Sequence, residues 1–154
     1  MRTAFVALLG VLSAAQSSGP ASAPATYLSD AAVTAALKES AKTAPDMHTA
    51  PVENTDHYRI NVVQRTKPQG AIAHPGFAEV HHIIDGTGTL VTGGTIVRPA
   101  NAGRGGAGAT IEGGVTRRVA KGDVILVPPG APHWYKDLDG GTLTYLEVRF
   151  QEIK

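Results

Sequence analysis

The stretch Gly-Asp-Val-Ile-Leu-Val-Pro-Pro-Gly-Ala-Pro-His, residues 122–133, contains the strongest structural signal in the chain. After a Lys-Gly turn, the segment 123–127, an aspartate followed by four apolar residues, has the length and composition of a strand. Two prolines, a glycine and a further proline then restrict the backbone over residues 128–132. They lead into His133 through a rigid bend. A metal ligand needs such an approach, because its geometry must be held tightly.

A second group of polar side chains lies upstream, on both sides of a Pro-Gly turn. His74 precedes this turn and Glu79 follows it. A turn of this kind can fold two short strands against each other, so that both side chains point into one cavity. Side chains alternate between the faces of a strand, so His81 accompanies Glu79 and His82 faces the opposite side.

The available donor atoms limit the chemistry of any metal site. The chain contains no cysteine, which excludes disulfides, thiolate ligands and a cysteine nucleophile. A metal must therefore bind to imidazole, carboxylate and water. Two imidazoles with one carboxylate, leaving open positions, form a facial triad, and these donors suit iron, manganese, zinc, nickel or copper.

The sequence from residue 57 to the end indicates many short strands. Tyr58 to Val63 alternates with a period of two, as a half-buried strand does. Further strands are expected at 71–74, 79–85, 89–92, 95–98, 115–119, 123–127 and 142–150. Gly-Thr-Gly at 86–88 is expected to stop one of them, and residues 99–109 read as a glycine-rich loop. Strands at this spacing predict a sandwich or a barrel.

The N-terminal region predicts export. Arg2 precedes the apolar segment 4–12, which is too short to anchor the chain in a bilayer, and small residues suited to signal cleavage follow. We assign residues 1–25 to a signal peptide and linker, and expect a periplasmic or secreted protein without a membrane anchor. Residues 26–56 should form a short helix, from Ser29-Asp30 to near Ala41, and then a loop. Residues 57–154 should form the barrel.

Length and charge exclude other classes of protein. The 154 residues suit one domain, and 42% hydrophobic with 18% charged residues is a globular composition. The formal net charge is +1 and no basic cluster stands out. Nucleic acid is therefore not an expected partner, because its binding needs a concentrated basic surface.

Two spacings resemble the motifs of the cupin superfamily. Gly122-x5-Pro128-x-Gly130-x2-His133 has the spacing of the second cupin motif, and His74-x4-Glu79-x6-Gly86 resembles the later part of the first. The resemblance covers residues 70–150. It implies an all-β fold, a double-sheet jelly-roll barrel, here preceded by a short N-terminal helix. It also implies one divalent metal ion in the mouth of the barrel, with His74, Glu79 and His133 as ligands.

The sequence departs from the cupin pattern at two positions. Ile72 stands where the first motif has its first histidine, and Asp137 stands where the second motif ends in asparagine. The expected shell of three histidines and one glutamate is thus one imidazole short. His81 or water could take the vacant position.

Three functions remain open at this point. The first is a metal-dependent enzyme that acts on a small organic substrate, with oxygenase-type chemistry favoured by the resemblance alone. The second is a lyase or isomerase that uses the same metal site. The third is a non-enzymatic barrel that binds a small ligand, which the isoleucine at position 72 supports. A homodimer is expected by analogy with cupins.

Individual side chains near the motifs also carry alternatives. We expect Glu79 and His81 to be catalytic, and for His81 direct ligation, contact with substrate and simple packing all remain open. Orientation of substrate or movement of a proton is the preferred role for His81, because two residues on one strand face lie roughly 6.5 to 7 Å apart. Trp134 and Tyr135 either line the barrel or form a wall for an apolar substrate.

Overall fold

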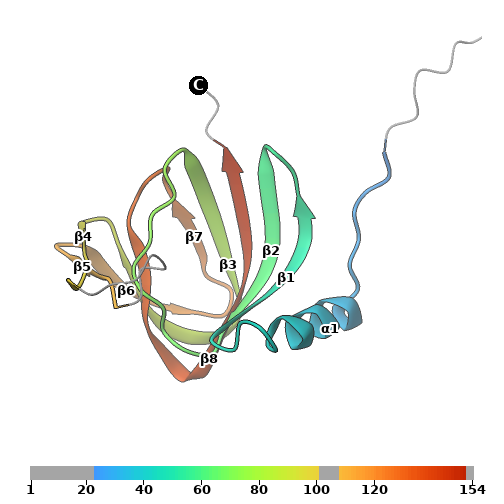
Figure 1. The fold of residues 1–154 in the computed structure, drawn as a ribbon, viewed down its shortest axis with the longest axis horizontal. Coiled ribbons are helices and arrows are strands. Elements are labelled where there is room, and N and C mark those ends of the chain that lie inside the picture. Colours follow the sequence, from blue (N-terminus) through green and yellow to red (C-terminus); the bar gives the residue numbers. More distant parts are fainter. Residues whose placement is uncertain (1–22, 101–107, 152–154) are drawn as a thin grey trace, which may run out of the picture.

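The computed structural model describes residues 23–100 and 108–151, which form one helix and eight strands (Figure 1). The predicted signal peptide lies mostly outside these residues. In chain order the elements are α1 (Asp30–Ser40), β1 (Met47–Asn54), β2 (Tyr58–Arg65), β3 (Phe77–Thr92), β4 (Thr95–Val97), β5 (Thr110–Glu112), β6 (Val115–Ala120), β7 (Val124–Val127) and β8 (His133–Gln151). No helix within the described ranges is long and apolar enough to cross a membrane.

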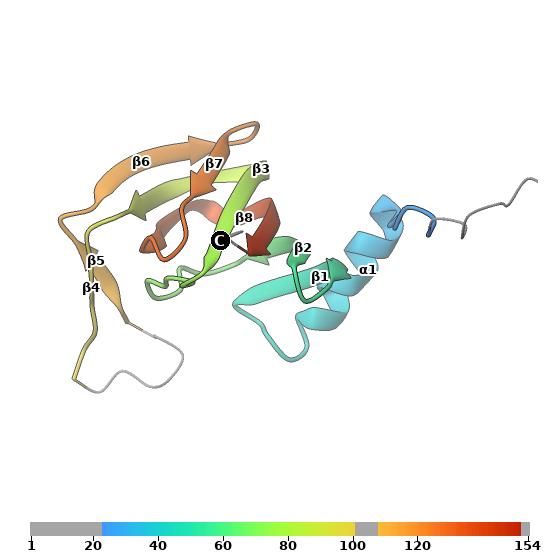
Figure 2. The same ribbon diagram turned by 90° about the horizontal axis from the view of Figure 1, so that it is seen from above.

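The two longest strands, β3 and β8, organise the fold. They pair antiparallel over almost their whole length, and the main sheet has the order β1-β2-β8-β3-β6, with β7 also pairing with β3. Both strands bend midway, so their two halves belong to two facing layers (Figures 1 and 2). One half of β3 pairs with β7 and the other with β6. The fold is therefore all-β with one short helix, as predicted.

The bend explains why the expected stop at residues 86–88 is wrong. The strand β3 runs through this segment with shifts of register on either side of Gly86. Gly86 has φ of 87°, and a Cβ atom there would clash with the carbonyl oxygen of Thr142. The glycine allows the strand to bend and β8 to approach closely, rather than ending the strand.

Residues 42–56 were predicted as a loop, and this prediction is wrong. They contain β1, an edge strand that pairs with β2. Its polar sequence and Pro51 suggest a loop, but edge strands tolerate both, and the register shifts beside Pro51. The barrel therefore begins at residue 47 rather than 57.

Other boundaries also differ from those expected. Of residues 71–74 only Ile72 forms a bridge, to His133, because the prolines nearby limit further pairing. The closing strand starts at His133 rather than 142, since the long partner β3 continues its ladder to that point. The strand β5 was not expected after the glycine-rich loop, part of which lies outside the described residues.

The helix α1 has the predicted bounds. The Ser29 side chain accepts a hydrogen bond from the backbone N–H of Ala32, which caps the N-terminus, and Ala41 is the C-cap. None of its residues is buried, although it lies along β1 at the outside of the sheet (Figure 2). The helix therefore adds little to the core.

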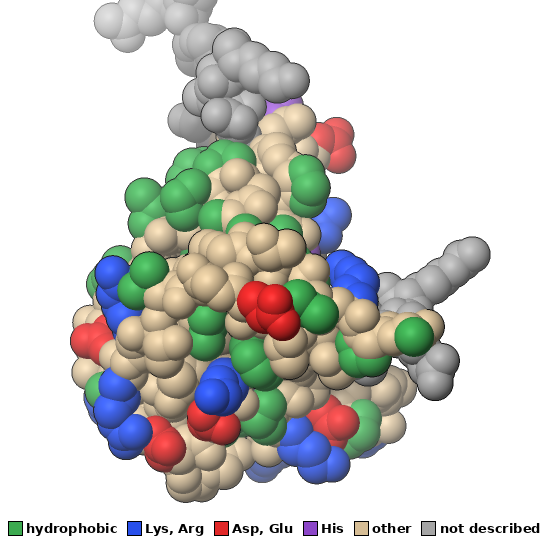
Figure 3. Space-filling view, turned by 90° about the vertical axis from the view of Figure 1, so that its left-hand side faces the viewer, with side chains coloured by type: hydrophobic (Ala, Val, Ile, Leu, Met, Phe, Trp, Pro, Cys, Tyr) green, Lys and Arg blue, Asp and Glu red, His purple; other side chains and the backbone are tan. Residues whose placement is uncertain are grey.

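The interior is apolar at the closed end of the barrel, where β3 and β8 bend. Its buried cluster comes from four strands and comprises Val63, Ile83, Leu90, Val119, Tyr135, Leu143 and Tyr145. On β3 the alternation of burial follows the predicted register. Glu79 and His81 are buried, whereas His82 is exposed. The exposed surface mixes charges of both signs with scattered apolar side chains (Figure 3).

Candidate metal centre

Backbone hydrogen bonds bring the two motifs together at the mouth of the barrel. The N–H of Gly130, in the bend before β8, donates to the carbonyl oxygen of His74 at 3.1 Å. Ile72 and His133 exchange two further backbone bonds, of 3.1 and 2.9 Å. The segment that carries His74 is thus fixed to the segment that carries His133. These main-chain hydrogen bonds hold the two segments together whatever their side chains are.

The structure brings the three predicted ligands together. His74 Nε2 lies 3.6 Å from Glu79 Oε1, and His133 Nε2 lies 3.7 Å from Glu79 Oε2. One donor atom from each residue lies within 4.8 Å of the others. Glu79 comes from β3 and His133 from the facing layer, so the two layers meet at this cluster.

The imidazole of His133 presents a free lone pair to this cluster, whereas the lone pair of His74 Nε2 already accepts a hydrogen bond. His133 Nδ1 lies 3.1 Å from the Ala131 carbonyl oxygen, which can only accept, so Nδ1 carries the hydrogen and Nε2 is left bare. His74 Nε2 accepts from the Arg149 guanidinium at 3.0 Å. Burial lowers the pKa of both histidines, although the Glu79 charge opposes the shift. They are therefore neutral near pH 7, the form that binds a metal.

Glu79 is ionised although it is 1% exposed. Burial alone would raise its pKa, but a hydrogen bond from His81 and the charges of His133 and Arg149 lower the pKa to about 2. Its Oε1 atom has no hydrogen-bond partner among the described residues. A buried carboxylate oxygen beside two imidazole lone pairs is a donor set that fits a divalent ion of the iron, manganese or zinc type.

His81 supports Glu79 from below. Its Nε2 lies 3.2 Å from Glu79 Oε2, and its Nδ1 lies 2.9 Å from the hydroxyl of Tyr135. Burial raises the pKa of Tyr135, so the phenol keeps its proton and donates to Nδ1. His81 then donates from Nε2. A second donor set, formed with Glu79 and Glu147, includes His81, but both of its ring nitrogens already have partners.

Sequence reasoning missed two charged residues of the site, Glu147 and Arg149. They face inward on β8, opposite His81 and Glu79 respectively. Arg149 Nη2 lies 3.2 Å from Glu147 Oε1, and Arg149 Nε lies 3.5 Å from Glu79 Oε1. Asn61, on β2, donates to Glu147 Oε2 at 2.9 Å. Their alternation with Leu146 and Val148 along the closing strand was the available signal.

A cavity of about 180 Å³ lies beside the polar cluster, and of the three candidate ligands only His74 lines it. Its walls are formed mainly by β1, β2 and β8 and comprise Met47, Thr49, Asn61, Val63, Arg65, Ile72, His74, Tyr145, Glu147 and Arg149. Ile72 thus places an apolar side chain in this wall, where the cupin pattern has a histidine. Deeper in the barrel, Arg65 Nε donates to the Tyr145 hydroxyl at 3.0 Å.

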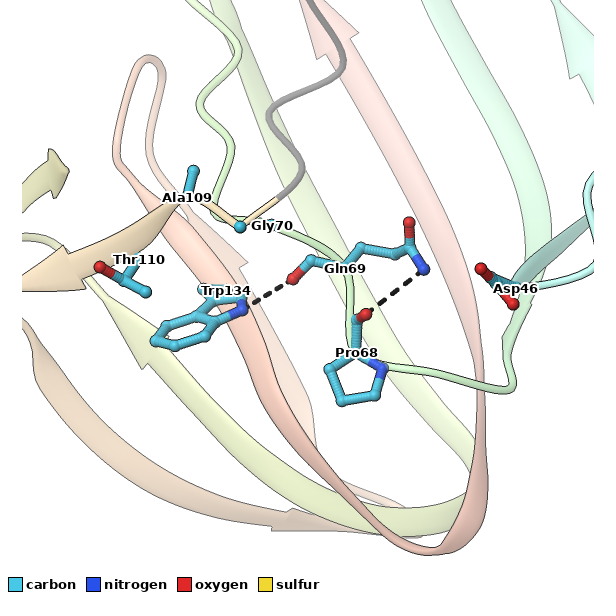
Figure 4. A pocket seen from close by; sticks show the side chains of 8 residues that line it. Asp46, Pro68, Gln69, Gly70, Ala109, Thr110 and Trp134 are labelled. Atoms are coloured by element: carbon cyan, nitrogen blue, oxygen red, sulfur yellow. Dashed lines mark hydrogen bonds between the residues drawn. The ribbon is translucent and has the colours of Figure 1, made fainter. Parts of the chain in front are cut away.

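Trp134 points away from this cavity. On β8 its neighbours His133 and Tyr135 are buried in the interior, and Trp134 lies on the other face of the strand. Its indole N–H donates to the Gln69 carbonyl oxygen at 2.7 Å, at the edge of a separate cavity of about 350 Å³ (Figure 4). Trp134 therefore does not line the cavity of about 180 Å³, whereas Tyr135 packs beneath that cavity.

No protein-family model matches the sequence, and no curated protein matches it either. Solved structures match at low identity. The cupin domain of Schizosaccharomyces pombe Cnp3 has a TM-score of 0.52 and 13% identity, over 69% of this chain and 61% of that one. A putative mannose-6-phosphate isomerase from Ralstonia eutropha has a TM-score of 0.51 and 17% identity, over 71% of this chain and 88% of that one.

The iron(II) form of HppE has a TM-score of 0.52 and 13% identity, over 68% of this chain and 50% of that one. The chain thus spans less than two thirds of the Cnp3 and HppE chains. Identities at this level show the fold alone. Together with the two bent strands, they show that this chain has a cupin-type fold.

Proposed function

We propose that the protein is a metal-dependent enzyme acting on a small organic substrate, with His74, Glu79 and His133 as the metal ligands. One observation carries the proposal. Two neutral imidazoles and one ionised carboxylate bring one possible donor atom each within 4.8 Å of one another, beside a cavity. A divalent ion bound there would supply Lewis acidity or, as iron, oxygen chemistry.

The residues around the ligands have separate tasks in this proposal. The Ala131 carbonyl holds the tautomer of His133, and His81 holds the Glu79 carboxylate. Such contacts orient ligands and raise their basicity. Three protein ligands leave coordination positions on the cavity side open to substrate. Ile72 keeps one wall of that space apolar.

Oxygenase-type chemistry is our preferred reaction class. Its support is the facial set of two histidines and one carboxylate, which is typical of non-haem iron oxygenases, and the likeness in fold to the iron(II) form of HppE. A lyase or isomerase on the same site is the alternative, and the fold is also shared with a putative isomerase. Oxygen uptake by the iron-loaded protein separates the two classes.

Metal content tests the proposal directly. Purified protein should bind one divalent ion per chain, measured by elemental analysis and calorimetric titration. His74→Ala and His133→Ala should each abolish stoichiometric binding while the circular dichroism spectrum remains that of a folded β-protein. His82→Ala is the matched control, because His82 lies on the same strand as Glu79 but on its exposed face. Full occupancy in either of the first two variants would refute the ligand assignment.

A specific observation favours a second function, a non-enzymatic barrel that binds a small ligand without metal. Arg149 already donates to His74 and lies beside Glu79, so a protein cation occupies part of the cluster. On this alternative the wild-type protein binds no divalent ion, and His74→Ala leaves ligand binding intact. The same titrations therefore distinguish the two functions.

We also propose that the protein is exported to the periplasm or secreted. The support is the sequence of residues 1–25, most of which lie outside the described residues. Intact-mass analysis of protein from its native host should give an N-terminus near Gln16 or Thr26. A mature chain that still begins at Met1 would refute export by this route.

A further inference from the structure

Arg65, on β2, is a buried cation in the cavity wall that no carboxylate neutralises. The residue is 6% exposed, yet no carboxylate oxygen lies within 4.0 Å of its guanidinium among the described residues. Arg149, in the same wall, has Glu147 at 3.2 Å and Glu79 at 3.5 Å. Buried arginines are almost always paired, because an unpaired charge loses its hydration without compensation. Arg65 therefore lacks the counter-ion that its burial calls for.

The protein contacts two parts of this guanidinium and leaves the third part open. Its face lies over the rings of Tyr135 and Tyr145, with Cζ at 5.3 and 5.8 Å from the ring centroids. Its Nε donates to the Tyr145 hydroxyl at 3.0 Å. Nη1 and Nη2 have no hydrogen-bond partner among the described residues, and neither nitrogen is fully enclosed. The Nη1–Nη2 edge is therefore an accessible fork of donors without acceptors.

The two tyrosines do not supply the missing negative charge. Burial raises the pKa of both Tyr135 and Tyr145, so both phenols are neutral at physiological pH. The contact of a guanidinium with an aromatic face attracts the cation but leaves its charge in place. The charge of Arg65 thus remains available to a ligand.

The neighbours of Arg65 in the sheet do not repel an anion. Arg65 is paired with Met47 on β1 and with Leu143 on β8, so apolar residues flank it on both sides. Glu147 is paired with Asn61, four positions from the pair of Arg65 and Leu143, which is roughly 13 Å along the strand. Asn61 also donates to Glu147 at 2.9 Å. The carboxylate of the cavity wall therefore belongs to the other end of this ladder.

We propose that the Nη1–Nη2 edge of Arg65 binds the carboxylate of a small organic anion in the cavity of about 180 Å³. Two parallel N–H groups of a guanidinium match the two oxygens of a carboxylate. The cavity is smaller than the pockets that hold drug-sized molecules, so the ligand has few atoms. His74 lines the same cavity, so this anion is also the substrate class of the metal site, a part of the inference that rests on the proposed function.

A phosphate group offers oxygens of the same kind but fits this wall less well. It brings a second charge and further oxygens that need partners of their own. The other guanidinium of the wall, Arg149, already lies against two carboxylates. One free fork therefore favours a carboxylate, and inorganic phosphate serves as a comparison probe.

NMR titration of the metal-free protein tests the assignment, because it measures weak binding. The probes are propanoate, the neutral propanamide of equal size, and inorganic phosphate. We expect propanoate to bind at least about tenfold more tightly than propanamide, because a charge-assisted bidentate pair is lost in the amide. Equal affinities, or no binding of propanoate, would overturn the proposal. Tighter binding of phosphate than of propanoate would refute the carboxylate.

A variant at Arg65 attributes the preference to its guanidinium. Arg65→Met replaces the charged fork by an unbranched apolar side chain and should abolish the preference for propanoate over propanamide. Arg118→Met, at an exposed arginine paired with Asp139, is the matched control and should keep the preference. Propanoate affinity that is unchanged in Arg65→Met would show that the anion binds elsewhere, which also overturns the proposal.

A second variant tests the site without removing Arg65. Met47 is the β1 partner of Arg65, lines the cavity and is 37% exposed, so a polar side chain is tolerated there. Met47→Glu offers the fork an internal carboxylate and should weaken propanoate binding by about tenfold or more. Met47→Gln has the same shape without the charge and should weaken binding less. Equal propanoate affinities in the two variants would contradict an anion site at Arg65.

Zinc titration separates this inference from the proposed function. If the wild-type protein binds no zinc but prefers propanoate through Arg65, the proposed function fails and the anion site stands. If it binds zinc and shows no preference that depends on Arg65, only this inference fails. The zinc-loaded protein should also prefer propanoate over propanamide. Loss of the preference on zinc loading would refute the carboxylate as the substrate class.

Discussion

The interior of this barrel has two ends with opposite character. At the closed end, Ile83, Leu90 and Leu143 are buried among aromatic rings and apolar side chains. At the mouth, Glu79, His133 and Glu147 are also buried, but they are polar and include two carboxylates. The same strands, β3 and β8, supply both ends. The comparison teaches that one strand can stabilise the fold over half its length and bear a reactive site over the other half.

The largest effect should come from a cavity at the closed end. Leu90 is 2% exposed, and Leu90→Ala should lower the free energy of unfolding by about 2–5 kcal/mol, measured by chemical denaturation. Leu126→Ala is the control, because that side chain is 64% exposed, and it should change stability by no more than about 0.5 kcal/mol. Similar effects from both variants would contradict the division between the two ends.

A smaller effect should come from the residue that joins the two ends, His81. His81→Phe removes the donor that orients the Glu79 carboxylate, so metal affinity should fall by about 10- to 100-fold, less than in His74→Ala. Tyr135→Phe removes only the hydroxyl bonded to His81. Its metal affinity should lie between that of His81→Phe and that of the wild type. Unchanged metal affinity in His81→Phe would show that His81 only packs in the core.

Lowering the pH should destabilise the metal-free protein, because titratable residues at the mouth of the barrel become protonated. The apolar residues at the closed end do not titrate. Burial lowers the pKa of His74 and His133, so their contribution to stability is lost as pH falls below about 6.5. Despite its burial, Glu79 has a pKa of about 2 against an ordinary 4.5, so its contribution is present above pH 4.5 and lost below it. Denaturation curves at several pH values should show both windows. Glu79→Gln should remove the lower one.

The smallest effect should come from restoring the missing imidazole. Ile72 lines the cavity beside His74, and its backbone is already bonded to that of His133. Ile72→His should therefore tighten metal binding modestly, on the order of tenfold, without unfolding the barrel. A matched Ile72→Leu variant should leave metal affinity unchanged. A loss of metal in Ile72→His would show that the wall at this position must stay apolar.

Much of the site could be predicted from sequence because its key residues lie at fixed spacings on short segments. The alternation on β3 placed Glu79 and His81 inside and His82 outside, and the structure confirms this register. The pairing of the two motifs across facing layers followed only from the resemblance to cupins. No local pattern could have shown that His133 approaches Glu79.

The parts that sequence reasoning missed depend on long-range pairing. Glu147 and Arg149 belong to the site only because β8 places them opposite His81 and Glu79. The length of β3 depends on a bend in which glycine marks close approach of β8 rather than a turn. The strand β1 is stabilised by its partner rather than by its own composition. Each of these outcomes is decided by a neighbour that is distant in sequence.

The backbone bonds from Gly130 to His74 and between Ile72 and His133 have an evolutionary consequence. They fix the positions of the ligand-bearing segments through main-chain atoms that every amino acid except proline can supply. Side chains at 72, 74 and 133 can therefore be exchanged singly while the frame that holds them persists. Descendants of one ancestor could gain, lose or change a metal by point mutation, without a new fold and without passing through an unfolded intermediate.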